Sequence, residues 1–580
     1  MPNLIFWENY TNRQDLKTYM PVDLCLYALE LKFRLEDIEA VARESVTEEC
    51  LTKEPDKKSD VIYINADERY AVIAQSYKAV DLKKAGAKAN KASDLNTAMA
   101  WLLSAEISTI PSNLQSYAHD LRSLIQANGI DELHIWYVHN LPETAAVQDE
   151  LTTVKSATQD ILKANYPNST MSLNVAEVGV ETISTWYKAS TTPILVTAQF
   201  ELKIDSKNRF EVKSDNWQSV VTYVSTKWIH TLFKKYQQDL FSANIRGYLG
   251  SVKKDNNINH TMKRTAETTP LNFFVFNNGI TAIVNDMDLS HEDKISFSGL
   301  AIVNGAQTTG VLGNLANEPD ETAKVQIRLI KCQDMQTVQN IVLYNNSQNK
   351  IQSADFKSND ACQQRLQKEF QDNSDITYGA RRGGTGDAIA RPSNLLPSVT
   401  AGQILAAFGG QPEVAAHSKN KIWEDDELYG KFFNERTTAA HIMFAFSLAK
   451  SIEGVKIALQ NKGAARTTDD DNYLKFLQNR GANLLLTAAI AGSLETIVGK
   501  KLINTDKTRF KNSSQLLAAI KNWDTIVQAV MPFTDKLQNA VIDLRNKEIQ
   551  GAAFTTFRSL VSSVRVSAPQ TYQTFADLVE

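Results

Sequence analysis

The chain has 580 residues, of which 43% are apolar and 22% are charged, as in ordinary globular proteins. Its net charge of -4 at pH 7 excludes a uniformly basic nucleic-acid coat, so any contact with nucleic acid must be local. No apolar segment reaches the roughly 20 residues of a membrane span, no basic-then-apolar leader opens the sequence, and the four cysteines form no CxxC pair. We therefore expect a cytoplasmic multidomain protein with no membrane partner.

Hydrophobic periodicity predicts an α/β (α+β) multidomain chain, with mixed sheets in the N-terminal and central domains and an all-helical C-terminal domain. In chain order the expected elements are a helix over 21–45, strands at 61–64 and 70–74, helices within 93–128, a strand at 133–138, a helix over 143–164, strands at 194–200, 280–284 and 324–330, and helices over 438–459, 471–499, 513–529 and 536–562. The expected domains are 1–128, 129–240, 241–436 and 437–580.

Two β-branched and aromatic runs around a polar turn predict a hairpin in the first domain. Placing Ile64 opposite Ala71 puts Asp60 opposite Gln75 at the open end of the hairpin. A carboxylate and an amide oxygen side by side suit a hard divalent cation, which prefers oxygen ligands. A cation held there could activate water for phosphodiester cleavage. The alternative is a surface hairpin that carries an Asp at its base and a Gln at its edge.

The segment from Asp60 to Lys78 resembles the core of restriction endonucleases, the PD-(D/E)XK fold, in the variant with Gln in place of the second acid. The resemblance implies that Asp60 and Gln75 bind Mg²⁺ or Mn²⁺, that Lys78 assists catalysis and that DNA is the substrate. In that pattern the lysine follows the Gln by two residues, whereas here Tyr77 does. Strand alternation then directs Lys78 to the other face of the sheet unless a bulge intervenes.

Further charged groups flank the hairpin. The resemblance implies an acid on the preceding helix, for which we choose Glu30, with Glu36, Asp37 and Glu39 as alternatives. After the hairpin comes a run of basic residues: Lys78, Lys83, Lys84, Lys88 and Lys91. Such a run can contact phosphates, and it is also typical of a solvated helix face.

Blocks of amide side chains next to glycines mark the centre of the chain. Amides donate and accept hydrogen bonds, and glycine turns before helices let backbone N–H groups approach a phosphate, although such turns are also ordinary structural elements. Several blocks within a short stretch favour a shared pocket for nucleic acid or a nucleotide. The residues that we assign to it are Asn244, Arg246, Asn277, Asn278, Asn304, Gln307, Thr308, Asn345, Asn346, Gln348, Arg381 and Arg382.

Taken in order, these blocks resemble the abortive infection phage resistance (AIPR) family over about residues 240–435. The resemblance includes NNGIT at 277–281, IVNGAQTT at 302–309 and NNSQN at 345–349. It implies a prokaryotic antiphage protein that shuts down the infected cell. The four domains are then a restriction-endonuclease-like domain, an α/β domain, an AIPR core and a helical domain.

Two hypotheses follow. In the first, the protein is an antiphage effector whose metal-dependent nuclease cleaves DNA and is gated by the AIPR core, which binds nucleic acid, a nucleotide or a phage-derived trigger. In the second, it is a non-catalytic nucleotide- or nucleic-acid-binding sensor or toxin with a degenerate nuclease fold, which Tyr77 in the lysine position favours. The sequence leaves open the trigger, the choice between DNA and RNA, and assembly into a homo-oligomer.

Overall fold

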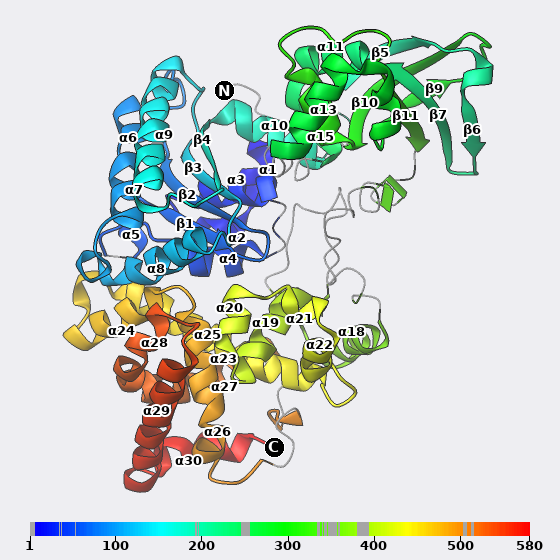
Figure 1. Cartoon of the computed structure of the whole chain (residues 1–580). Helices are drawn as coiled ribbons and strands as arrows, with labels where there is room; N and C mark the ends of the chain where they lie inside the picture. The colour runs from blue at the N-terminus through cyan, green and yellow to red at the C-terminus, as the bar shows by residue number, and fades with distance from the viewer. Residues whose placement is uncertain are drawn as a thin grey trace.

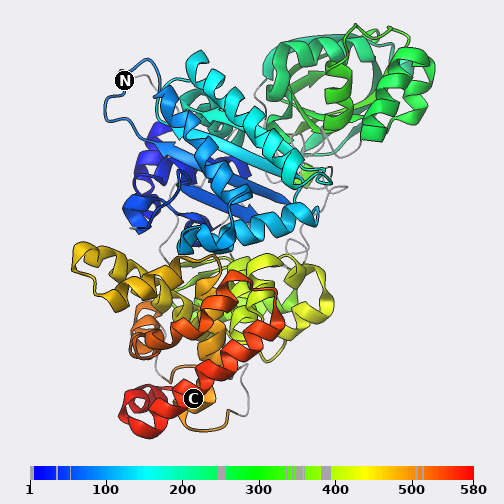
Figure 2. The same ribbon diagram turned by 60° about the vertical axis from the view of Figure 1, so that its left-hand side comes forward.

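The computed structural model describes residues 6–244, 256–332, 360–379, 394–502 and 507–580, apart from scattered positions, and a few residues between 333 and 359. These residues form three units: two built around sheets and one helical (Figure 1). Both views place the helical unit along one side of the first unit, and the second sheet unit at its other end (Figure 2). In the described part of the chain, no helix combines the length and apolar character that crossing a membrane requires.

The first unit contains a four-stranded sheet with the order β1-β2-β3-β4. Its strands are β1 (Val61–Asn65), β2 (Tyr70–Tyr77), β3 (Glu132–His139) and β4 (Ser172–Val178). Strands β1 and β2 form the predicted antiparallel hairpin, whereas β2, β3 and β4 are parallel. The predicted register is confirmed, since Ile64 pairs with Ala71 and Val61 with Ala74.

Helices cover both faces of this sheet, because side chains of both parities along its strands are apolar. Val61, Tyr63, Val72 and Ala74 pack in one core with α3, α4 and α10, while Ile62, Ile64, Ala71 and Ile73 pack in another with α6, α7, α8 and α9. These helices are α3 (Asp23–Phe33), α4 (Ile38–Ser45), α10 (Val180–Thr191), α6 (Ala89–Ser93), α7 (Leu95–Leu103), α8 (Ser112–Gln126) and α9 (Ala145–Asn165). We call these surfaces the α3 face and the α9 face.

The second unit contains a seven-stranded sheet with the order β5-β10-β8-β11-β7-β6, and β9 pairs with β10 at its side. Its strands are β5 (Val196–Lys203), β6 (Phe210–Lys213), β7 (Trp217–Ser225), β8 (Ile280–Val284), β9 (Asp286–Asp288), β10 (Lys294–Asn304) and β11 (Lys324–Cys332). Its helices include α11 (Thr226–Tyr236), α13 (Asn256–Thr268), α14 (Phe273–Phe276) and α15 (Ala306–Gly313). One apolar core joins one side of the sheet to α11, α13 and α15.

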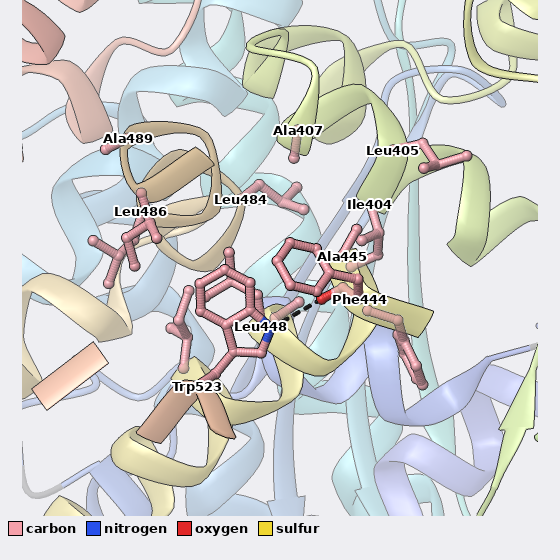
Figure 3. Close-up of a cluster of buried hydrophobic side chains, with 14 of the residues drawn as sticks. Ile404, Leu405, Ala407, Phe444, Ala445, Leu448, Leu484, Leu486, Ala489 and Trp523 are labelled. Atoms are coloured by element: carbon pink, nitrogen blue, oxygen red, sulfur yellow. Dashed lines mark hydrogen bonds between the residues drawn. The ribbon is translucent and has the colours of Figure 1, made fainter. Parts of the chain in front are cut away.

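The third unit is helical, and one continuous apolar core links residues from Leu366 to Val579. In its centre, Trp523 packs on Phe444 and donates its indole N–H to the Phe444 carbonyl at 3.0 Å (Figure 3). Its main helices are α18 (Ala361–Asn373), α19 (Ser398–Phe408), α20 (Pro412–His417), α22 (Asp426–Phe432), α23 (Ala439–Lys462), α24 (Thr468–Gln478), α25 (Ala482–Gly492), α26 (Leu494–Val498), α27 (Leu516–Val530), α28 (Gln538–Ile542), α29 (Lys547–Ser567) and α30 (Gln570–Leu578).

The three expected boundaries between domains differ from the limits of these units. The boundary at 128 falls inside the first sheet, because β3 pairs with β2, and the boundary at 240 falls inside the second sheet, because β7 pairs with β11. The boundary at 436 falls inside the continuous helical core. A local sequence pattern does not reveal parallel pairing between strands that are far apart in the chain. It also does not reveal the packing of helices that a long loop separates.

Candidate functional site

Asp60 stands at the open end of the hairpin, where the sequence placed it. Its N–H donates to the Ala74 carbonyl at 2.9 Å, directly before Val61, whose pairing with Ala74 is the last of the hairpin register. The Asp60 carboxylate accepts a hydrogen bond from the Ser76 N–H at 2.6 Å. The side chains of Asp60 and Gln75 are both buried. Asp60 thus binds the backbone of the residue that follows Gln75, whereas the hairpin register itself ends at the Val61–Ala74 pair.

Two further carboxylates join Asp60, and the sequence analysis did not single them out. One oxygen each of Glu48, Asp56 and Asp60 lies within 4.8 Å of the others, and all three residues are buried. We call these three residues the acid cluster. The loop that carries Glu48 and Asp56 folds back on β1, because the N–H groups of Thr47 and Glu48 donate to the Asp60 carbonyl at 2.9 and 3.1 Å.

Burial raises the pKa of the Asp60 carboxyl well above its usual value, and the nearby charges of Glu48 and Asp56 raise it further. The hydrogen bond from the Ser76 N–H acts in the opposite direction. Among the described residues, no Lys or Arg forms an ion pair with Asp56 or Asp60. Ionised carboxylates buried together are costly, so Asp60 holds its proton to a higher pH than an exposed aspartate does.

Gln75 directly precedes Ser76, whose N–H binds the Asp60 carboxylate. Its Oε1 is buried and has no hydrogen-bond partner among the described residues. A buried amide oxygen without a donor costs free energy that a cation would recover. Carboxylate and amide oxygens are the ligands that Mg²⁺ and Mn²⁺ take in proteins. The donor set of the acid cluster and Gln75 therefore fits such an ion.

Lys78 lies on the other face of the sheet. Its Nζ donates to Asp23 Oδ2 at 2.7 Å and lies 5.3 Å from the centre of the Tyr10 ring. Tyr10 donates its hydroxyl to the same Asp23 oxygen at 2.6 Å. Alternation along β2 places Gln75 and Tyr77 on the α9 face instead, where Tyr77 packs against the apolar core. The structure thus brings Asp60 and Gln75 together but does not bring Lys78 to Gln75.

Glu30 lies on α3, where Arg13 binds its carboxylate. The acid of α3 that meets the hairpin is Asp23, through Lys78, and its Oδ1 is buried with no partner among the described residues. Asp60 is also close to this helix, because its charge, after burial, raises the pKa of the Cys25 thiol. Asp23 is the first residue of α3, and the sequence analysis did not single it out.

In the second unit, two glycine turns that the sequence analysis singled out lie side by side. Asn277 Nδ2 donates to Thr308 Oγ1 at 3.1 Å, and Asn277 Oδ1 accepts from the Gly279 N–H at 3.0 Å. Gly305 caps α15 with a φ of 91°, and a Cβ there would lie 2.8 Å from the Gly279 carbonyl oxygen. Only glycine permits this backbone conformation together with so close an approach.

A second polar group crosses the same end of this sheet. Asn304 pairs with Thr281 on the neighbouring strand, and Thr281 pairs with Arg328 on the next one. Arg328 donates to Thr281 Oγ1 at 3.2 Å and to Asn345 Oδ1. Arg328 was missed from the sequence because it sits inside an apolar strand. The blocks around 277, 304 and 345 thus meet at one end of the sheet.

The remaining members of the predicted central pocket divide into two groups. Asn278 is exposed and Gln307 is half-buried, and Asn244 ends the 3₁₀ helix Gln237–Asn244. The others lie outside the described residues: Arg246, Asn346, Gln348, Arg381 and Arg382.

Comparison with known proteins decides the family. The AIPR family, described as AIPR protein, matches residues 241–534, which is just over half of the chain. The chain belongs to the AIPR family. The resemblance inferred from the amide blocks is thereby confirmed, and family membership indicates a role in abortive-infection defence against phages. The match begins inside the seven-stranded sheet of this AIPR protein and ends in its helical unit, so it does not include the hairpin. No curated protein and no solved structure matches the chain.

Proposed function

We propose that this AIPR protein is a metal-dependent nuclease that acts on DNA during abortive infection, and that its site is the acid cluster with Gln75. The observation that carries the proposal is the convergence of three buried carboxylates within 4.8 Å of one another, one of which accepts the N–H of Ser76, the residue after Gln75, whose buried oxygen lacks a described partner. A divalent ion at that point relieves both features at once, because it supplies the positive charge and accepts the oxygen lone pairs.

In this proposal the bound ion supplies Lewis-acid activation of water and of the scissile phosphate. Asp60 would be one ligand, because its carboxylate lies within 4.8 Å of the other two acids and accepts a hydrogen bond from the Ser76 N–H. Glu48 closes the site from the folded-back loop, and Gln75 contributes a neutral oxygen from β2. The raised pKa of Asp60 means that a proton competes with the metal, so binding of the ion strengthens as pH rises.

The second unit is the proposed gate. Its amide-rich end, with Asn277, Thr308, Asn304 and Asn345 near Arg328, has the donors and acceptors to bind a nucleotide or nucleic acid. Occupation of this end by a phage-derived trigger would then license cleavage in the first unit. The Asn277–Thr308 hydrogen bond supports one shared pocket, because it joins two of the predicted blocks.

Cleavage of plasmid DNA by the purified full chain tests the proposal, with Mg²⁺ or Mn²⁺, in the presence and absence of phage lysate. Asp60→Asn preserves the shape of the side chain and should abolish cleavage. The matched control is Asp149→Asn, since Asp149 is exposed on α9, and it should cleave like the wild type. Cleavage that survives Asp60→Asn in a folded protein would disprove the assignment.

The second candidate is a non-catalytic sensor. The position of Lys78 favours it, because this lysine forms an ion pair with Asp23 on the face of the sheet opposite Gln75. That candidate predicts metal binding without cleavage under any trigger. It also predicts that toxicity in infected cells is unchanged by Asp60→Asn and lost on Asn277→Ala. Asp60→Asn therefore separates the two candidates, whereas both predict a loss of function on Asn277→Ala.

A further inference from the structure

One lysine of the basic run lies on the same face of the sheet as Gln75. Lys91 belongs to the short helix α6, and its Nζ lies 6.0 Å from the centre of the Tyr77 ring. Tyr77 follows Gln75 by two residues on β2, so both project to the α9 face. The ammonium of Lys91 is therefore held over the residue that occupies the expected lysine position.

The helix that carries Lys91 is fixed to the strands of the site. The Tyr137 hydroxyl donates to the Lys88 carbonyl at 3.1 Å, just before α6 begins. Tyr137 is also the direct partner of Gln75 in the β2–β3 register. Ala92, the residue after Lys91, is fully buried in the core of the α9 face. These contacts hold α6 on the α9 face of the sheet without using the Lys91 side chain.

The ammonium group of Lys91 is available to bind a phosphate, whereas that of Lys78 is already paired with a carboxylate. No described carboxylate forms an ion pair with Lys91, and its side chain is half-buried. Lys78 by contrast is bound by Asp23 at 2.7 Å. Tyr77 attracts the Lys91 ammonium through its ring face, which favours one place for a long and otherwise mobile side chain.

We infer that Lys91 contacts a phosphate of the bound DNA strand and takes the part that the sequence assigned to Lys78. This inference rests on the proposed nuclease function. Three carboxylates with one divalent ion keep one negative charge, which repels a phosphate, and one ammonium from α6 cancels it. The positive charge of Lys91 thus reduces the repulsion between the DNA phosphates and a site that is otherwise acidic.

Two measurements on the full chain test the inference, with the variants Lys91→Gln and Lys91→Arg. The first is kcat/KM for DNA cleavage with Mn²⁺. The second is binding of a short labelled duplex in Ca²⁺, at several salt concentrations. We expect Lys91→Gln to lower kcat/KM roughly tenfold or more, as for a lost charged hydrogen bond, with Lys91→Arg near wild type. The slope of log affinity against log salt should fall by about 0.9 in Lys91→Gln, because one phosphate contact is lost.

The matched control is Lys84→Gln, an exposed lysine of the same basic run, which should leave kcat/KM within about twofold because a surface charge far from the phosphate contributes little. Wild-type values for Lys91→Gln, together with loss of cleavage in a folded Lys78→Gln, would overturn the inference and leave the nuclease proposal intact. Loss of cleavage in both Asp60→Asn and Lys91→Gln supports the nuclease proposal and the inference on Lys91. A wild-type chain that neither cleaves nor binds the duplex would overturn both.

Discussion

Arg480 of the helical unit donates to Asp120 on α8 of the first unit, and both side chains are buried. The same guanidinium donates to the Ile64 carbonyl at 3.1 Å, at the end of the strand that begins beside Asp60. Its Nη1 also donates to His417 Nδ1 at 2.8 Å. One arginine therefore ties the helical unit to the hairpin of the candidate site.

Replacing Arg480 tests this connection. Arg480→Met leaves Asp120 buried without its main partner, and breaking a buried ion pair in this way costs about 3–5 kcal/mol. We expect that loss in the free energy of unfolding measured with urea. Arg509→Met serves as the control, because Arg509 pairs with Glu580 at the surface and such pairs contribute less than about 1 kcal/mol. Equal losses in the two variants would refute the proposed role of Arg480.

Titration of His417 should contribute to the pH dependence of the free energy of unfolding. Burial lowers the pKa of His417 to about 3, and the charges of Arg480 and Arg545 act in the same direction, against that of Asp120. Between about pH 6.5 and 3 the unfolded chain binds a proton on this residue that the folded chain does not. Stability should therefore fall as pH drops through this window, by up to about 1.4 kcal/mol per pH unit from this group.

The comparison of wild type with His417→Gln isolates that contribution. Unfolding free energies measured between pH 7 and 4 should converge or cross, because the variant lacks the titrating ring. Parallel pH profiles of the two proteins would show that His417 titrates alike in both states. The Asp120 carboxyl, whose pKa is held below its usual value, loses its stabilising charge at a more acidic pH and so leaves this window undisturbed.

Asp60→Asn should change stability in opposite directions with and without metal. The raised pKa of Asp60 means that its ionised form destabilises the metal-free fold as pH rises above the carboxyl value of the unfolded chain. The amide should therefore raise the unfolding temperature of the metal-free protein at neutral pH. Wild type should gain about 2.7 kcal/mol when Mn²⁺ reaches 100 times its Kd, and Asp60→Asn should gain none.

Differential scanning fluorimetry with EDTA and with a series of Mn²⁺ concentrations gives both readings. Asp149→Asn, at an exposed position, should follow the wild type in each series. A metal-free Asp60→Asn protein that melts below the wild type would contradict the assigned repulsion within the acid cluster.

Gln478→Ala should weaken metal binding from a distance. Gln478 Nε2 donates to the carbonyl of Thr52, which ends α5 (Glu49–Thr52), the short helix directly after Glu48. Losing this bond frees the loop that presents Glu48, so calorimetry should show a several-fold higher Kd for Mn²⁺. Gln570→Ala, at an exposed position on α30, is the control and should leave the Kd unchanged.

The hairpin shows how far the sequence alone could lead. Its register was predictable, because two apolar runs and one polar turn allow a single pairing that buries every strand residue. The position of Lys78 also followed from alternation. Glu48 and Asp56 were not predictable, because backbone hydrogen bonds from Thr47 and Glu48 to the Asp60 carbonyl fold their loop onto the strand. Such bonds leave no trace in side-chain patterns.

The same distinction holds for larger features. The amide blocks at 277 and 304 meet because the first directly precedes β8, the second ends β10, and these antiparallel strands are neighbours. The extent of the first unit was not predictable, since β3 and β4 join the hairpin by parallel pairing after long helical crossovers. The place of Lys91 was not predictable, because it depends on the position of α6. The packing of Ala92 and the hydrogen bond from Tyr137 to the Lys88 carbonyl help to fix that position.

Strand β1 lies at one edge of its sheet, and an open edge invites pairing with strands of other molecules. Here Val46 bridges to Val61 at one end of that edge, and Arg480 binds the Ile64 carbonyl at the other. The helical unit thereby helps to prevent the exposed edge of the hairpin from pairing with another molecule. Fragments that end before the helical unit should consequently aggregate during expression, and coexpression of the missing unit should restore them to solution.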